Sequence, residues 1–171
     1  MKIRRAKIED ATTIAQINVT TWHNAYKGLI DDAILKARVV DEKRIAAWEE
    51  TIKNPNRIVL VCESNKEVVG YLTAGPARDD CGIENELFAL YVKPSSQNQG
   101  IGSALINEYK KIIKNRPFYL YMLKNNQKAA GFYEKNGGVV CKKFNHNLEV
   151  QGHTFEEVCY VFEGVSAAID T

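Results

Sequence analysis

The amino-acid sequence predicts one α/β domain built on a mixed sheet, and three observations support this fold class. The chain has 171 residues, a length that suits one domain with a sizeable core. Short apolar runs typical of strands separate segments in which apolar residues recur at helical spacing. No repeat or linker interrupts this pattern, so residues 1–164 should form the domain, whereas residues 165–171 should fray.

The N-terminal part of the chain predicts an edge strand and two helices. The strand covers residues 3–8, and residues 9–10, Glu-Asp, then place negative charge at the positive end of a helix. Residues 24–36 are less regular. A second helix should begin after Asp41, which suits an N-cap, and should end at residues 54–56, Asn-Pro-Asn.

The remaining two thirds of the chain are dominated by strands. The first two of these strands should form a hairpin, and the last two should pair around residues 145–153. Residues 75–82 form a polar loop, and a helix over residues 127–136 should be closed by Gly137. The expected strands cover residues 57–63, 67–74, 84–92, 118–123, 138–144 and 154–163.

Residues 97–104, which read Gln-Asn-Gln-Gly-Ile-Gly-Ser-Ala, stand where a strand turns into a helix. The start of a helix offers unpaired N–H groups and the positive end of the helix dipole. Glycines at such a point, here Gly100 and Gly102, let a ligand approach the backbone closely. These properties suit a pyrophosphate, although glycines at a strand-to-helix turn often serve only the turn.

Two common nucleotide-binding patterns do not fit this loop. The string required for a Walker A loop is absent, and the third glycine of the dinucleotide fingerprint is missing. A third pattern does fit, because Gln97-x-x-Gly100-x-Gly102 resembles the acyl-CoA loop of the GNAT superfamily of N-acetyltransferases.

Two further segments are similar to the same family. Residues 86–92, Glu-Leu-Phe-Ala-Leu-Tyr-Val, resemble its fourth strand, and residues 126–137 resemble its Asn-x-x-Ala-x-x-Phe-Tyr-x-x-x-Gly segment. The three matches occur in order and cover residues 86–138, about a third of the chain. One departure is Gly138, where the family usually has an aromatic residue, and it concerns the packing of the next strand.

The resemblance implies a mostly antiparallel mixed sheet with helices on both faces and acetyl-CoA as the co-substrate. It also implies that the fourth strand splays from its neighbour and that the pantetheine arm fills the gap. No lysine or arginine lies between Gln97 and Glu108, so backbone amides should carry more of the phosphate binding. The cofactor-binding residues implied in this way are Leu90, Tyr91, Val92, Gln97, Asn98, Gln99, Gly100, Ile101, Gly102, Ser103, Ala104 and Asn126.

Tyr133 is the candidate general acid. A phenol close to the sulfur of the thioester can protonate the leaving thiolate, and the resemblance places Tyr133 there. The alternative is a helix tyrosine that packs on the sheet beside Phe132. Asn126 has a similar ambiguity, because it could bind the pantetheine arm or cap the helix that follows.

Glu86 is the candidate general base. An amine is mostly protonated at pH 7, and a carboxylate can take the proton directly or through water. Strand alternation puts Glu86 on one face with Phe88, Leu90 and Val92, an apolar setting that would raise its pKa. The alternative is a glutamate at the strand end, in solvent beside Glu84.

The acceptor site is expected near the aromatic cluster of residues 21–28, which resembles a Trp-x-x-x-Tyr-x-Gly string in a bacterial subgroup of the family. Trp22 and Tyr26 could hold an amine by cation–π contact, or they could simply pack in the core. No metal site is predicted, because the four cysteines lie far apart in the sequence.

The function expected is acetyl transfer from acetyl-CoA to a primary amine by direct attack. Two alternatives stay open: a non-catalytic module that senses acyl-CoA, and an enzyme that modifies peptides or proteins. The formal charge of +2, dispersed over the chain, argues against nucleic acid as a partner. With no membrane-length apolar run and no secretory signal, a cytoplasmic protein is expected, and a homodimer is compatible with the sequence.

Overall fold

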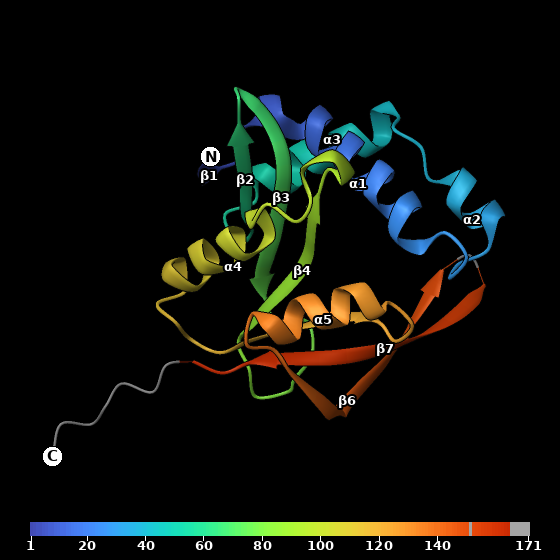
Figure 1. Ribbon diagram of the computed structural model, residues 1–171, viewed down its shortest axis with the longest axis vertical. Helices are drawn as coiled ribbons and strands as arrows, with labels where there is room; N and C mark the ends of the chain where they lie inside the picture. Colours follow the sequence, from blue (N-terminus) through green and yellow to red (C-terminus); the bar gives the residue numbers. More distant parts are fainter. Residues whose placement is uncertain (151, 165–171) are drawn as a thin grey trace, which may run out of the picture.

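The strands of the protein form one continuous sheet with helices on both faces (Figure 1). The computed structural model describes residues 1–150 and 152–164, and the predicted fraying of residues 165–171 lies outside these. In sequence order the strands are β1 (Lys2–Arg5), β2 (Ile58–Ser64), β3 (Glu67–Pro76), β4 (Asn85–Val92), β5 (Phe118–Leu123), β6 (Val139–Val150) and β7 (His153–Phe162). The helices are α1 (Ala11–Tyr26), α2 (Asp32–Ala37), α3 (Glu42–Lys53), α4 (Ile101–Ile112) and α5 (Gln127–Lys135), with 3-10 turns at Ile8–Asp10 and Pro94–Ser96.

The strand order in this sheet is β1-β2-β3-β4-β5-β7-β6. Every neighbouring pair is antiparallel except β4 and β5, which run parallel. The predicted class, a mixed and mostly antiparallel sheet, is therefore confirmed. The predicted hairpin is also confirmed, since β2 and β3 pair directly along their lengths.

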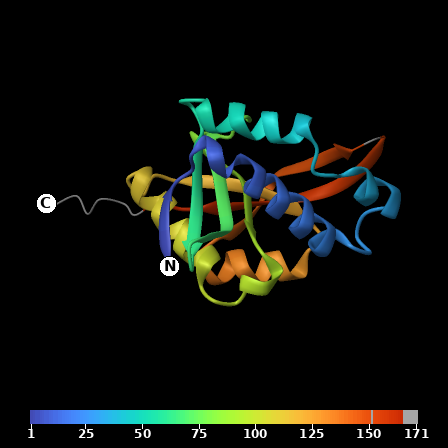
Figure 2. The ribbon, with the colours of Figure 1, turned by 90° about the horizontal axis from the view of Figure 1, so that it is seen from above.

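The two faces of the sheet bury different side chains. Figure 2 shows α3 and α5 on opposite sides of the central strands. Beneath α4 the core contains Leu72, Leu105 and Leu120, each no more than 1% exposed. Ile14 and Val61 belong to the core of the other face, against which Trp48 of α3 packs. Two cavities described below lie against the middle strands, one lined in part by α4 and α5 and the other by α1 and α3.

Three segments differ from the prediction. The edge strand expected at residues 3–8 ends at Arg5, and a 3-10 turn begins at Ile8. The stretch expected to be irregular, residues 24–36, contains the end of α1 and most of α2. The connection expected at residues 145–153 is mostly strand, because β6 continues to Val150 and pairs with β7. Its polar residues resemble a loop in the sequence, but the partner strand satisfies their backbone groups. A register shift between Cys141 and His146 interrupts this pairing.

Asp10 stabilises the junction between β1 and α1. Its carboxylate accepts hydrogen bonds from the Arg4 guanidinium at 2.7 Å and from the backbone N–H of Lys7 at 2.7 Å. Burial pushes the pKa of Asp10 upward, but these hydrogen bonds outweigh burial and hold its pKa below the ordinary value. The ionised form is therefore favoured in the folded protein, so Asp10 stabilises the fold above its unfolded pKa.

Replacing Asp10 with asparagine is expected to lower the free energy of unfolding at pH 7 by about 1–3 kcal/mol. The deficit should shrink below about pH 4, as the aspartate of the wild-type protein is protonated through its lowered folded pKa. Urea unfolding of both proteins between pH 3 and 7 measures this. Glu9→Gln, an exposed neighbour, is the control. A deficit that does not change with pH would show that the ion pair is not its source.

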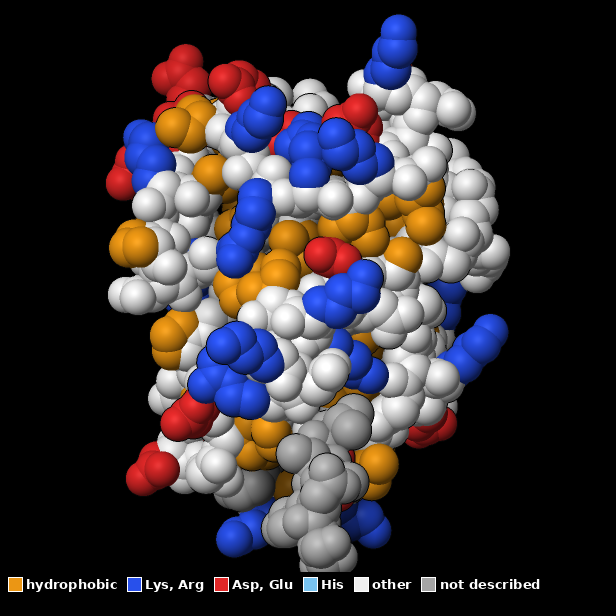
Figure 3. All heavy atoms as spheres, turned by 90° about the vertical axis from the view of Figure 1, so that its left-hand side faces the viewer, with side chains coloured by type: hydrophobic (Ala, Val, Ile, Leu, Met, Phe, Trp, Pro, Cys, Tyr) orange, Lys and Arg blue, Asp and Glu red, His pale blue; other side chains and the backbone are white. Residues whose placement is uncertain are grey.

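The outer surface carries charges of both signs. On the face shown in Figure 3, lysine and arginine side chains lie among acidic and hydrophobic ones. Within the described residues, no helix is both long enough and apolar enough to span a membrane.

Candidate active site

A cleft of about 840 Å³ opens between β4 and β5. These strands pair only at Asn85–Phe118 and Glu86–Tyr119, and they separate beyond that point. Alternate residues of β4 point their N–H groups away from β3, and no strand meets them on the β5 side past Glu86. The predicted splay is present, and the free edge of residues 87–92 lines the cleft.

The start of α4 lies at one end of this cleft. Gly100 is the N-cap residue, and its φ of +78° belongs to the left-handed region that favours glycine. The first helical hydrogen bond runs from the N–H of Ala104 to the carbonyl of Gly100. The N–H groups of residues 101–103 precede that bond, so they are free for an anion.

Gly102 has a second structural role. A Cβ at this position would lie 2.8 Å from the ring of Phe132, so the glycine also lets α4 approach α5.

Not all of the predicted loop faces the cleft. The lining includes Gln97, Asn98 and residues 100–103, whereas Gln99 and Ala104 do not contribute.

A lysine that the sequence did not indicate stands beside this loop. Lys128, at the start of α5, donates a hydrogen bond to Oε1 of Gln97 at 2.6 Å and lines the cleft. Nε2 of Gln97 in turn donates to the carbonyl of Val92 at 3.0 Å. The loop lacks a cation of its own, but α5 supplies one, so backbone amides are not its only source of positive potential.

Replacing Ser103 with proline is expected to weaken CoA binding by about 10–150-fold, the effect of losing one hydrogen bond to a charged group. Proline in the first helical turn keeps the backbone angle and removes one free N–H. The preceding Gly102 tolerates the restriction that proline imposes on its neighbour. Calorimetry with CoA measures the affinity.

The matched control is Ser103→Ala, which keeps the N–H group and should bind CoA like the wild-type protein. Equal affinity of the proline and alanine variants would contradict an anion site at this helix terminus.

Asn126 caps α5 and also lines the cleft. Its Oδ1 accepts a hydrogen bond from the N–H of Ala129 at 3.1 Å, so the capping alternative holds. Its side-chain NH₂ group has no partner within residues 1–150 and 152–164, and Asn126 can therefore cap the helix and donate to a ligand at once.

Tyr133 lies on the wall of the cleft opposite β4. Its ring packs against Phe132, Tyr160 and Phe162. Its hydroxyl has no hydrogen-bond partner in the described part of the chain. Burial, with a smaller contribution from nearby Tyr26, raises the pKa of Tyr133 above its ordinary value. The phenol therefore keeps its proton at neutral pH and can donate it.

The two aromatic residues predicted for the acceptor have different positions. Tyr26 lines the cleft. Trp22 is 7% exposed, packs with Leu35 and Leu123 in the core, and lines neither this cleft nor the second cavity described below. Trp22 can act on the site only indirectly, because it stacks under the Arg38 guanidinium and edge-on against Tyr26.

The face on which Glu86 lies corrects the alternation expected from the sequence. A register shift between Thr73 and Ala74 places a bulge in the β3–β4 pairing. Leu87, Leu90 and Val92 consequently pack on the α4 side, which puts Glu86 on the opposite face from all three. Of the three residues predicted to share the face of Glu86, only Phe88 lies near it. The Phe88 ring lies over Gly75, and Gly75 is the residue of β3 that pairs with Glu86.

The surroundings of Glu86 are polar, contrary to the apolar environment that was predicted. Its side chain is fully buried. Arg78 donates to the carboxylate from Nε at 3.0 Å, from Nη2 and from its backbone N–H at 3.1 Å. The Tyr119 hydroxyl adds a hydrogen bond at 3.0 Å. The solvent-exposed alternative for Glu86 is also wrong.

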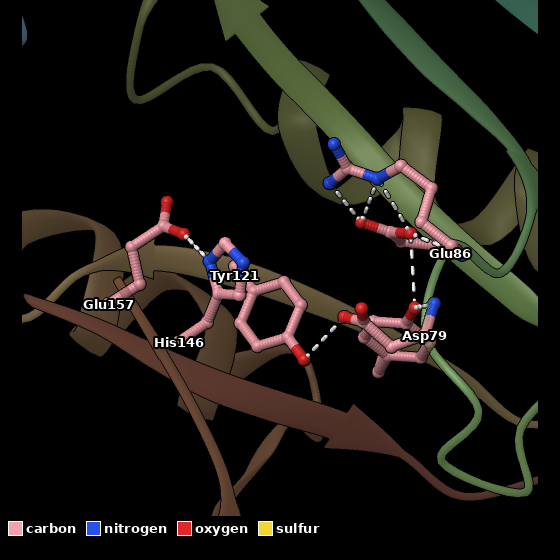
Figure 4. A network of polar contacts seen from close by, with 7 residues as sticks. Asp79, Glu86, Tyr121, His146 and Glu157 are labelled. Carbon is pink, nitrogen blue, oxygen red and sulfur yellow. Dashed lines mark hydrogen bonds and ion pairs between the residues drawn. The ribbon is translucent and has the colours of Figure 1, made fainter. Parts of the chain in front are cut away.

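A polar network extends from Glu86 toward β6 and β7 (Figure 4). The Tyr121 hydroxyl donates to Asp79 at 2.9 Å, and the Tyr121 ring lies against His146. His146 pairs with Glu157 at 2.9 Å. The alternation of Tyr119 and Tyr121 on β5 was the one sequence signal for this network, because it puts both rings on one face.

Comparisons with known proteins agree with this geometry. The sequence model of the acetyltransferase (GNAT) family matches residues 19–138. Spermidine N(1)-acetyltransferase of Thermoplasma acidophilum is 24% identical over 144 residues, covering 80% of this chain and 87% of that protein. L-amino acid N-acyltransferase MnaT of Escherichia coli (strain K12) is 32% identical over 108 residues, covering 63% of this chain and 59% of that protein.

A solved structure has the same fold. The PaiA N-acetyltransferase of Thermoplasma acidophilum, crystallised in complex with coenzyme A, superimposes with a TM-score of 0.72. It is 24% identical in sequence, and the match covers 92% of this chain and 96% of that one. The family match spans more than half of the chain and contains the splayed strands, the glycine loop and Tyr133. The chain therefore belongs to the GNAT family of acetyltransferases.

Proposed function

We propose that the protein transfers acetyl from acetyl-CoA to a primary amine by direct attack of the amine on the thioester. The observation that carries this proposal is the cleft between β4 and β5, which has a free strand edge along one wall and the start of α4 at one end. The coenzyme A bound to the structural relative from Thermoplasma acidophilum supports the choice of co-substrate.

Acetyl-CoA fits the groups that line this cleft. The free N–H groups of residues 101–103 would hold its pyrophosphate, with Lys128 nearby as a cation. The free edge of residues 90–92 would hydrogen-bond the pantetheine arm as an added strand, and a backbone N–H there would hold the thioester oxygen. The NH₂ group of Asn126 would donate to the same arm.

Tyr133 acts as the general acid in this mechanism. When the tetrahedral intermediate collapses, the carbon–sulfur bond breaks and the phenol donates its proton to the departing thiolate. Its raised pKa keeps the donor protonated at neutral pH. Direct attack needs no cysteine nucleophile. Cys62 is buried, and burial raises the pKa of its thiol.

Glu86 accepts the proton of the acceptor amine, directly or through a water molecule. The Arg78 guanidinium occupies oxygens that would receive this proton, so the amine or the water must replace one of those contacts. Arg78 lies on the loop before β4, and its side chain is 62% exposed, which leaves room for that exchange.

Two other functions compete with this proposal. A module that only senses acyl-CoA would bind the thioester without turnover. An enzyme for peptides or proteins would prefer an N-terminal or lysine amine in a peptide over a free amine.

We place the protein in the cytoplasm because its four cysteines are free thiols, which suit a reducing compartment.

The decisive experiment is a thiol-release assay with acetyl-CoA across amino acids, polyamines, aminoglycosides and peptides. The proposal expects thiol release with at least one free amine, well above the rate with acetyl-CoA alone. Tight CoA binding without thiol release would favour the sensing module. Turnover restricted to peptides would favour the peptide enzyme.

A further inference from the structure

A second cavity, of about 640 Å³, lies on the face of the sheet covered by α1 and α3. Thr73 and Phe88 form part of its floor, and Asn18 and Trp48 form part of its walls. Its volume is in the range of small-molecule sites. Five cationic side chains line it, against one acidic side chain. They are Arg38, Lys43, Arg44, Arg57 and Arg78, with Asp41 as the acid.

Among the described residues, no cation of this basic cavity has a carboxylate partner except Arg78, which pairs with Glu86. Arg57 stacks on the Phe88 ring at 4.0 Å, and its guanidinium makes no hydrogen bond or ion pair within the described residues. The Arg78 guanidinium lies 5.0 Å from the centre of the same ring. Two guanidinium groups therefore lie close to one aromatic ring, and Arg57 is the one whose charge an anion in the cavity would balance.

Arg38 adds an unsatisfied donor. Its Nη2 donates to Asn18 at 2.8 Å, but its buried Nε has no hydrogen-bond partner in the described part of the chain. A buried guanidinium N–H without an acceptor costs free energy, and an anion beside it would supply the missing acceptor. Burial, and to a smaller extent the charge of Arg44, lowers the pKa of Arg38 below its ordinary value, and a bound anion would relieve both effects. Among the described residues, the Arg44 guanidinium donates only to the Val39 carbonyl.

The basic cavity and the cleft between β4 and β5 share one lining residue, Phe88. Glu86 lines neither of them, but it pairs with Arg78, which lines the basic cavity. A small molecule in the basic cavity with its amine toward the Arg78–Glu86 pair would place its other end near Arg57 and Arg38.

We propose that the acceptor is a small amine that also carries an anionic group, a carboxylate or a phosphate, which the guanidinium groups of Arg57 and Arg38 bind. This rests on the proposed acetyl transfer and adds the substrate class. Five cations would repel a polyamine, so cationic acceptors such as spermidine should be poor substrates.

The first test compares matched acceptors in the thiol-release assay. The pairs are L-leucine with 3-methylbutylamine, L-methionine with 3-(methylthio)propylamine, and O-phosphoethanolamine with ethanolamine, with spermidine as a cationic acceptor. The member of at least one pair that carries the carboxylate or phosphate should have a KM about 10–150-fold lower than the amine without it, as expected for hydrogen bonds to a charged group. The carboxylate and phosphate pairs distinguish the two anions.

The second test uses Arg57→Gln, with Lys53→Gln as the matched control, because Lys53 is a nearby cation that does not line the cavity. Arg57→Gln should raise KM at least about 10-fold for the acceptor with the anionic group and raise KM much less for the amine that lacks this group. Lys53→Gln should change neither, and CoA affinity should be the same in all three proteins.

Two outcomes would overturn the inference. One is equal or better turnover of spermidine or of the amines that lack an anionic group, and the other is an Arg57→Gln effect of the same size on both members of a pair. Thiol release from no amine at all, in a protein that binds CoA, overturns the proposed function and this inference with it. Turnover restricted to amines without an anionic group leaves the proposed function standing, so the two failures are distinguishable.

Discussion

Replacing Tyr133 with phenylalanine is expected to lower kcat by about 10²–10⁴-fold, the usual contribution of a positioned general acid. The hydroxyl has no hydrogen-bond partner among the described residues, so its removal leaves no other polar group without a hydrogen bond. The ring contacts with Phe132, Tyr160 and Phe162 should survive. The effect should appear in kcat and leave CoA affinity nearly unchanged, because the proton is needed only in the transition state.

The matched control for this variant is Tyr109→Phe. Tyr109 is a buried tyrosine of α4 whose hydroxyl has no hydrogen-bond partner among the described residues, and it lies outside the cleft. It should therefore tolerate the same change with wild-type kcat. A thioester with a poorer thiol leaving group should make the loss in Tyr133→Phe larger. Wild-type kcat in the Tyr133 variant would leave this residue only its packing role.

The pH profile provides a second readout for Tyr133. Because burial raises its pKa, the donor form persists to higher pH than in an ordinary tyrosine. Loss of activity through deprotonation of Tyr133 should therefore occur only above about pH 10, the ordinary pKa of tyrosine. A basic limb near pH 8 that disappears in Tyr133→Phe would contradict this environment.

Replacing Glu86 with glutamine is expected to lower kcat/KM at pH 7 by about 10²–10⁴-fold while leaving CoA affinity nearly unchanged. The amide keeps the shape of the side chain but cannot accept the proton of the amine. The acidic limb of the wild-type profile should change accordingly. Steady-state assays between pH 6 and 9.5, with the best acceptor of the panel, measure both effects.

A structural role for Glu86 must be separated from a chemical one, because its carboxylate also holds Arg78 and Tyr119. The loss in Glu86→Gln should shrink as pH rises toward the pKa of the acceptor amine, since less of the amine then needs a base. It should also shrink with a weakly basic amine. A loss that stays constant under both conditions would assign Glu86 to positioning alone.

The matched control for Glu86 is Glu84→Gln. Glu84 lies just before β4, its side chain is 79% exposed, and it pairs with Arg116 at the surface. Surface pairs of this kind contribute little, so the control should keep wild-type activity and stability. An equal loss in both variants would point to a general effect of charge near β4.

Local sequence signals were sufficient for most of the fold. Apolar runs and turn residues gave the β2–β3 hairpin, and Asp41 caps α3 as expected, accepting a hydrogen bond from the N–H of Arg44. The strand, the glycine loop and the start of α4 depend on residues that are close together in the chain. Such signals are readable because backbone angles, caps and hydrophobic period are properties of short segments.

The sequence by itself therefore determined the fold class and the family, and it indicated residues 97–104 as the candidate anion site. Only the tertiary structure decided the chemistry around Glu86, because a bulge between strands changes which side chains share a face. It also brought Lys128 to the glycine loop and assembled the basic cavity from α1, α3, β3 and loops between them. These contacts join residues far apart in sequence, and no local period or cap encodes such pairings.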